Sequence, residues 1–209
     1  MPPADPARHG AAGRVAARLG QTAAMSAVAG DPSSWLVVID MQEVFADPAG
    51  GWHAPGTVGL LGPIGRLAAA WEGRVVLTRF VAPAEPAGAW RRYYEEWPWA
   101  LVAPDDPLYA LLDGLPKGPV VTETTFGKWG PGLASVIGDA DLVVCGVATD
   151  CCVLSTALAA ADAGRHVTVA ADACAGSSPA AHDRTLALLA GYLPLIEVRT
   201  VDDLLGAEK

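Results

Sequence analysis

The sequence predicts an α/β protein with three layers (α/β/α), in which helices cover both faces of a doubly wound sheet of six parallel strands. Two observations predict this class. Between residues 35 and 200, short apolar runs alternate with amphipathic or Ala-rich stretches of helical character. The first run, WLVVID at 35–40, is apolar at almost every position, as expected of a strand buried on both faces. Strands interleaved with helices pair in parallel, so one sheet covered on both sides follows.

Six segments are predicted as strands: 35–40, 74–80, 118–123, 141–147, 166–172 and 195–200. Five segments are predicted as helices: 58–73, 107–115, 131–138, 151–164 and 178–192. The first helix is expected to end near Gly73, and its glycines and Pro63 weaken it. The last helix is expected to begin with Ser178 as N-cap and Pro179 in its first position.

Composition narrows the function classes. The chain has 209 residues, which suits one compact domain, and no apolar run is long enough to cross a bilayer. Its net charge of −9 argues against a nucleic acid or an anionic membrane as partner and says nothing positive about a substrate. The four cysteines lack paired CxxC spacing and the four histidines are scattered, so we expect a reduced, cytoplasmic protein without metal or other cofactor.

Residues 1–33 differ from the rest of the chain. They are rich in Ala, Gly and Pro, contain no aromatic residue before position 34, and lack the apolar core of a secretory signal. A short helix is one interpretation of this segment, and a flexible extension is the one that its composition favours. We therefore expect a flexible N-terminal extension over 1–33 and a single domain over 34–209.

Polar residues gather where the predicted strands end. In a doubly wound sheet, ligands bind beyond the carboxyl ends of the strands. Asp40, the pair Thr78–Arg79, Glu123 and the turn 146–152 all occupy such positions. The topology therefore brings a carboxylate and a cysteine into one cleft.

Three segments together resemble the isochorismatase-like cysteine hydrolase superfamily, whose members include nicotinamidases and N-carbamoylsarcosine amidohydrolases. They are VVIDMQEVF (37–45), VVTETTFGKW (120–129) and GVATDCCVLSTALAAADAG (146–164), followed by DACAG (172–176) and His182. The likeness spans about residues 35–200 and implies the Rossmann-like fold of that superfamily. It is specific because D-x-Q after a strand and G-x-x-T-x-x-C-V at a strand–helix turn occur in the expected order.

The resemblance implies roles for individual residues. Cys152 matches the nucleophile, and Asp40 matches the carboxylate that orients it and accepts its proton. The peptide Val147–Ala148 matches one that is cis in relatives, and the N–H groups of Ala148 and Cys152 match the oxyanion hole. Cys151 falls where relatives need no thiol. Independently of the family, a cysteine in the first turn of a helix is favoured as thiolate by the helix dipole.

One departure concerns the third catalytic residue. The superfamily has a lysine where this alignment places Glu123, and a carboxylate there would raise the pKa of the thiol or itself hold a proton. Three explanations remain open. Lys128 supplies the missing ammonium, or a protonated Glu123 acts as an acid, or the site is impaired.

A second departure concerns metal and substrate. Nicotinamidases carry D-x-H after the second strand, whereas this chain reads TRFVAPAEP there, so neither a metal nor nicotinamide is expected. Arg79 either recognises a carboxylate or carbonyl oxygen of the substrate or forms a salt bridge at the sheet edge. His182 is expected to be structural. Superfamily members commonly oligomerise, which implies a homodimer or homotetramer.

Segment 86–106 is rich in aromatic residues, and two interpretations fit it: a lid over the cleft, or a subunit interface. Trp52 and His53 are expected on the same wall as the lid. The predicted substrate-binding residues are Gln42, Phe45, Arg79, Trp90, Tyr94, Trp97, Phe126, Lys128 and Val147.

The sequence thus favours a metal-independent hydrolase of an amide-like C–N bond, with a Cys152 acyl-enzyme and Asp40 as base. Two alternatives stay open. One is a small-molecule-binding protein that has lost catalysis through Glu123, and the other is a hydrolase of a vinyl ether, as in isochorismatases.

Overall fold

A computed structural model describes residues 33–206, so the predicted N-terminal extension lies outside the described residues except for Ser33. The centre of the fold is a sheet of six strands in the order β3-β2-β1-β4-β5-β6, and all neighbouring strands are parallel. The strands are β1 (Ser34–Ile39), β2 (Val75–Phe80), β3 (Val120–Glu123), β4 (Asp141–Val147), β5 (Val167–Ala175) and β6 (Ile196–Arg199). The predicted doubly wound α/β class is confirmed.

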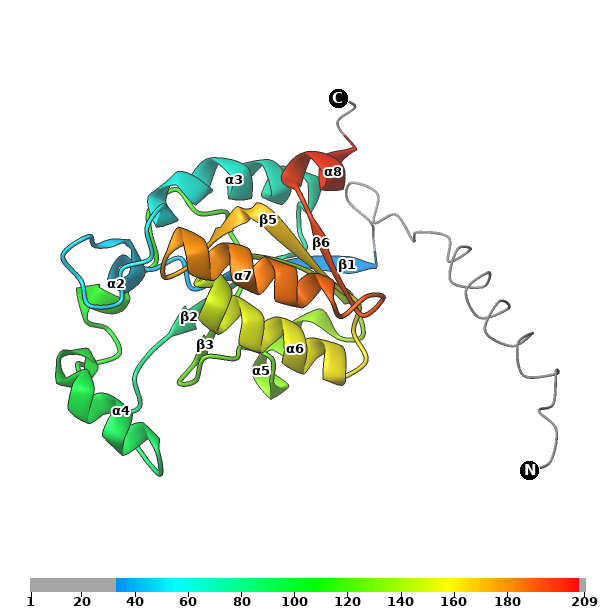
Figure 1. Ribbon diagram of the computed structural model, residues 1–209. Helices are drawn as coiled ribbons and strands as arrows, with labels where there is room; N and C mark the ends of the chain where they lie inside the picture. Colours follow the sequence, from blue (N-terminus) through cyan, green and yellow to red (C-terminus); the bar gives the residue numbers. More distant parts are fainter. Residues whose placement is uncertain (1–32, 207–209) are drawn as a thin grey trace, which may run out of the picture.

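Helices cover both faces of this sheet: α3 and α8 lie on one face, and α5, α6 and α7 lie on the other (Figure 1). The α-helices are α2 (Glu43–Ala46), α3 (Leu61–Ala70), α4 (Trp90–Glu96), α5 (Pro131–Ile137), α6 (Leu154–Asp162), α7 (Pro179–Ala190) and α8 (Val201–Leu205). Short 3-10 turns are η2 (Thr57–Leu60), η3 (Pro98–Ala100) and η4 (Pro107–Tyr109), and η5 (Thr149–Val153) is a π-helical turn. None of the helices in residues 33–206 is long and apolar enough to span a membrane.

The two central strands, β1 and β4, approach each other closely. Ile39 lies in register with Gly146, whose φ of 106° is in the left-handed region. A Cβ on Gly146 would lie 2.1 Å from the carbonyl oxygen of Ile39, so only glycine fits there. The strand order reverses between β1 and β4, where ligands bind in such sheets. Asp40 and the turn after β4 therefore meet at the switch point.

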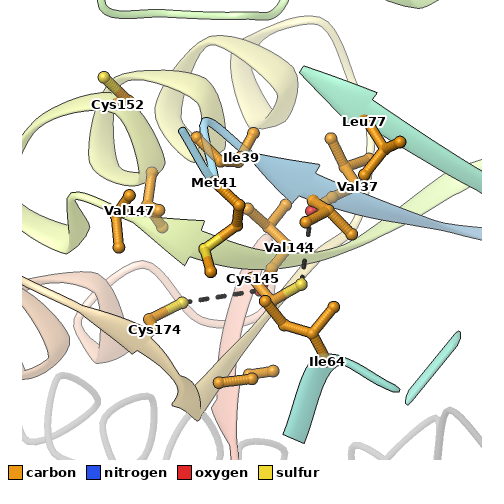
Figure 2. Close-up of a cluster of buried hydrophobic side chains, with 14 of the residues drawn as sticks. Val37, Ile39, Met41, Ile64, Leu77, Val144, Cys145, Val147, Cys152 and Cys174 are labelled. Carbon is orange, nitrogen blue, oxygen red and sulfur yellow. Dashed lines mark hydrogen bonds between the residues drawn. The ribbon is translucent and has the colours of Figure 1, made fainter. Parts of the chain in front are cut away.

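Two of the four free cysteines belong to the core rather than to this edge. The Cys145 and Cys174 thiols lie 3.8 Å and 4.0 Å from the carbonyl oxygens of Val37 and Val144 (Figure 2). Burial raises the pKa of Cys174 to about 12, and burial also raises the pKa of Cys145. Figure 2 shows Cys152 apart from both, on a helical turn beyond the strands.

The predicted elements differ from the structure mainly outside the sheet. The predicted helix over 107–115 is wrong, because only η4 forms there. The chain then runs beside the residues that follow β1. Leu111 forms an isolated antiparallel β-bridge with Gln42, and the Leu112 N–H donates to the Met41 carbonyl at 2.9 Å. Helices α2, α4 and α8 were not predicted. The predicted N-cap is confirmed, since the Ser178 hydroxyl accepts from the N–H of Ala181 at 3.2 Å.

Candidate active site

Asp40 directly follows β1 and is fully buried. Its φ of 47° lies in the left-handed region, which Asp adopts more readily than most residues. The Asp40 N–H donates to Thr78 Oγ1 at 3.2 Å, and the Thr78 hydroxyl donates to Asp40 Oδ1 at 2.7 Å. Strand β2 thus fixes the carboxylate through Thr78, and the second carboxylate oxygen remains for another partner.

That partner is Lys128. Its Nζ lies 3.0 Å from Asp40 Oδ2, and both side chains are 0% exposed. The ammonium also donates to the Thr125 carbonyl at 2.7 Å and lies 5.0 Å from the centroid of the Phe80 ring, a cation–π distance. A charge that is fully removed from water needs this kind of pairing, because an unpaired buried charge is strongly unfavourable.

The loop that carries Lys128 is tied to the turn that carries Cys152. The Lys128 N–H donates to Thr156 Oγ1 at 2.9 Å, and the Thr156 hydroxyl donates to the Cys152 carbonyl at 2.6 Å. One threonine on α6 therefore couples the position of the ammonium to that of the cysteine.

Cys151 and Cys152 lie in η5, directly after β4, and both line a cavity together with Ala148. The peptide bond between Val147 and Ala148 is cis. A hydrogen bond with the Cys151 thiol, burial and the Asp40 carboxylate raise the pKa of Cys152 well above its usual range, and Lys128 opposes this. The hydrogen bond with Cys152 lowers the pKa of Cys151. The two thiols therefore titrate as a pair. Cys151 loses its proton first, and the proton that Cys152 keeps stabilises the Cys151 thiolate through their hydrogen bond.

The cavity measures about 280 Å³ and is mainly aromatic. Its lining residues are Phe45, Gly51, Trp52, His53, Ala54, Phe80, Tyr93, Phe126, Ala148, Cys151, Cys152 and Ser177. Trp52 organises the wall: its ring centroid lies 5.6 Å from that of Phe80, 5.9 Å from that of Tyr93 and 4.8 Å from that of Trp99. Because Tyr93 comes from α4, the aromatic segment covers the cavity of its own chain, which favours the lid interpretation.

Glu123 is the last residue of the edge strand β3, whereas Asp40 follows the central strand β1, and β2 lies between the two strands. A Cβ on Gly132 would lie 3.2 Å from Glu123 Oε1, which places this carboxylate at the first turn of α5. A negative charge is favourable there because of the helix dipole. Of the three explanations for the missing lysine, the geometry favours the first, in which Lys128 supplies the ammonium.

Arg79 and Gln42 were predicted to contact the substrate, but neither of them lines the cavity. Successive side chains of a strand point to opposite faces of the sheet, so Arg79 lies on the face opposite to that of Thr78 and Phe80 on β2. Its Nε lies 3.4 Å from Thr122 Oγ1. Gln42 is fully buried, and its amide donates to the Phe80 carbonyl at 2.9 Å and accepts from the Phe80 N–H at 2.8 Å. It holds the end of β2 rather than a ligand.

The remaining predicted contacts divide into two groups. Phe45 and Phe126 line the cavity, and so do Trp52 and His53, which were expected on the same wall. Those that do not line it are Trp90, Tyr94, Trp97, Val147 and Lys128. The rings of Trp90 and Trp97 form an outer layer, with centroids 5.0 Å from Phe126 and 6.1 Å from Trp52.

Sequence reasoning did not select Tyr93 or Ser177 as site residues. Helical spacing was the available signal for Tyr93, since it lies three residues after Trp90 and both rings reach Phe126. No comparable signal marks Ser177, whose hydroxyl donates to Asp150 at 2.6 Å. His182 pairs with the Thr149 hydroxyl at 2.8 Å, which supports a structural role.

A metal site needs several His, Cys, Asp or Glu side chains close together. Within residues 33–206, no group of three or more His, Cys, Asp or Glu side chains is arranged to hold a metal ion. The described residues therefore do not fit a metal centre.

The chain matches the model of the isochorismatase domain over residues 34–203. A cysteine hydrolase from Pseudomonas syringae pv. phaseolicola 1448A is 24% identical with a TM-score of 0.72, covering 82% of this chain and 90% of that one. PnC1 from L. infantum, solved with nicotinate, is 25% identical with a TM-score of 0.68, covering 82% and 94%. The zinc complex of the pyrazinamidase of Pyrococcus horikoshii is 23% identical with a TM-score of 0.65, covering 81% and 99%. Among curated proteins, none matches the sequence.

Proposed function

The chain belongs to the isochorismatase family of hydrolases, and on that premise we propose that it cleaves an amide C–N bond of a small molecule through a cysteine acyl-enzyme. The observation that carries the proposal is the buried ion pair between Lys128 and Asp40, 3.0 Å apart, joined through Thr156 to the turn of Cys152. A base, a cation and a thiol at one end of a sheet are the parts that covalent acyl transfer requires.

In the first half of the reaction, Cys152 Sγ attacks the amide carbon and Asp40 accepts the thiol proton. The developing oxyanion accepts hydrogen bonds from the N–H groups of Ala148 and Cys152, at the start of the helical turn. The C–N bond then breaks, and the leaving amine takes the proton from Asp40. The ammonium of Lys128 stays beside Asp40 throughout and stabilises its charged form.

In the second half, water attacks the thioester and Asp40 accepts a proton from it. The C–S bond breaks, Cys152 recovers its proton, and the carboxylic acid leaves. The overall reaction consumes one amide and one water and yields one acid and one amine. The raised pKa of Cys152 suits this scheme, because the thiol gives up its proton during attack rather than beforehand.

The test is ammonia release from a panel of primary carboxamides. We expect Cys152→Ala to reduce turnover by ~10⁴-fold or more, since the nucleophile is lost. Cys151→Ala is the matched control, because it removes the adjacent thiol and leaves the proposed nucleophile in place. Unchanged turnover in Cys152→Ala would exclude the acyl-enzyme, and a loss confined to Cys151→Ala would assign the nucleophile to the other thiol.

A further inference from the structure

Cys151 is a nucleophilic group that the proposed hydrolytic mechanism does not use. It directly precedes Cys152 in η5, and both side chains line the same cavity. Cys152 is only 3% exposed, whereas Cys151 is half-buried. A reagent that enters the cavity therefore meets two neighbouring thiols rather than one.

The other two cysteines offer no comparable site. The thiols of Cys145 and Cys174 lie in the core beside backbone carbonyl oxygens, and neither residue lines the cavity. Burial raises the pKa of both thiols, and only the thiolate is strongly reactive. Of the four cysteines in the sequence, only Cys151 and Cys152 are adjacent.

The backbone disfavours a disulfide between these two cysteines. Adjacent Cα atoms across a trans peptide lie about 3.8 Å apart, whereas the Cα atoms of a disulfide usually lie about 4.4–6.8 Å apart. A hydrogen bond joins the two thiols instead. Two sulfur atoms that are held close together without a bond can both bind one larger thiophilic atom placed between them.

We propose that Cys151 and Cys152 form a chelating site for trivalent arsenic with two exchangeable oxygen ligands, as in arsenite or the hydrated form of an aryl arsine oxide. Overall, two As–O bonds break and two As–S bonds form, and the two thiol protons leave with the hydroxyl groups as water. The arsenic stays trivalent, so no oxidant or reductant is required. Thiolate sulfur is a soft ligand, which suits this soft acceptor. The binding needs only the two thiols and does not depend on the hydrolytic mechanism.

The environments of the thiols set the order of the two steps. The hydrogen bond with Cys152 lowers the pKa of Cys151, so Cys151 supplies the first thiolate. Once Cys151 holds the arsenic, Cys152 attacks the same atom within one molecule. Its high effective concentration then compensates for its raised pKa. Chelation occupies Cys152 and should block any reaction in which this thiol attacks a substrate.

The walls of the cavity distinguish two sources of such arsenic. The rings of Phe45, Trp52 and Phe126 line the cavity next to the thiols. A phenyl group carried on the arsenic can pack against these rings, whereas arsenite has no group that does so. We therefore expect both to bind, and phenylarsine oxide to bind more tightly than arsenite.

Native mass spectrometry of the full-length protein tests the proposal with phenylarsine oxide and, separately, with sodium arsenite. We expect one arsenic per chain and protection of both Cys151 and Cys152 from alkylation by iodoacetamide. Excess glutathione, which carries one thiol, should not remove the arsenic. The dithiol 2,3-dimercaptopropanol should remove it.

Three variants separate chelation from binding to a single thiol. Cys151→Ser and Cys152→Ser each leave one thiol of the pair, so the affinity for phenylarsine oxide should fall at least about 10²-fold, the usual advantage of a second linked contact. Glutathione should then remove the arsenic. Cys174→Ala is the matched control, because it removes a thiol of the core and keeps the pair, and its affinity should not change.

Undiminished affinity in either serine variant would overturn the proposal. Protection of Cys145 and Cys174 in the wild type, in place of Cys151 and Cys152, would also overturn it, and this result needs no variant. Ammonia release from carboxamides by the arsenic-bound protein bears on the other proposal. If it persists while both thiols are protected, the chelating site is confirmed and Cys152 is not the hydrolytic nucleophile.

Discussion

Replacing Lys128 by methionine tests the ion pair on which the site depends. Methionine keeps a long apolar stem but removes the ammonium. The Asp40 carboxylate, which is 0% exposed, would then retain only the Thr78 hydroxyl and no cation. The Thr125 carbonyl would also lose the hydrogen bond that the ammonium donates at 2.7 Å.

The expected loss follows from these contacts. Removing one member of a buried ion pair costs about 3–5 kcal/mol, because the other charge stays buried without compensation. The lost hydrogen bond to the Thr125 carbonyl adds to this, and the packing of the methionine stem offsets part of it. We therefore expect Lys128→Met to lower the free energy of unfolding by about 3–5 kcal/mol, a large fraction of the ~5–15 kcal/mol typical of a domain.

Urea unfolding measures this loss as a shift of the midpoint at unchanged slope. Lys117→Met is the matched control, because Lys117 is exposed and forms no ion pair within the described residues. It should change stability by less than about 0.5 kcal/mol. The double variant Asp40→Asn, Lys128→Met should lose clearly less free energy of unfolding than the two single variants lose together, since no isolated buried charge remains in it.

A Lys128→Met variant as stable as the Lys117→Met control, together with a strictly additive double variant, would contradict the expected loss. That result would mean that the ammonium is solvated and does not pair with Asp40. In the expected case, amide hydrolysis should also fall by at least about 10²-fold, the usual contribution of a positioned acid–base system.

Two further predictions concern Glu123 and the thiols. Glu123→Lys should gain no amidase activity, because Lys128 already provides the ammonium. Its free energy of unfolding, measured with urea, should instead fall by about 0.3–1 kcal/mol, since the substitution places a cation at the start of α5. A gain of amidase activity would show that the site lacks its cation. The pH dependence of iodoacetamide alkylation, followed for each cysteine by mass spectrometry, should have a midpoint for Cys152 above the free-thiol value of about 8.5 and one for Cys151 below it. A raised pKa means less thiolate at neutral pH, so a Cys152 midpoint below that of Cys151 would contradict the assigned direction.

The sheet and the meeting of Asp40 with Cys152 could be predicted because both depend on strongly patterned features. Buried parallel strands are continuous apolar runs, and their carboxyl ends meet at one edge whatever the loops do. The exclusion of Arg79 could also have been predicted, since strict alternation along β2 places it opposite Thr78 and Phe80.

The position of Lys128 could not be predicted in the same way. It depends on the path of the loop after β3, which is set by Thr156, a residue 28 positions away. The choice of Tyr93 from an aromatic-rich segment likewise depends on how α4 packs against Trp52 and Phe126. Such contacts form only in the folded chain and leave no local period in the sequence.

The negative charge at position 123 and the positive charge at position 128 are both favourable where the structure places them. The site needs one positive charge beside Asp40, and this requirement concerns a place in space rather than a place along the chain. Once Lys128 meets it from the loop, the end of β3 no longer has to carry a cation, and a carboxylate there becomes favourable beside α5. A motif alignment that examines only position 123 would class the chain as impaired. The electrostatics of the folded site, with the ammonium 3.0 Å from the Asp40 carboxylate, argue for an intact one.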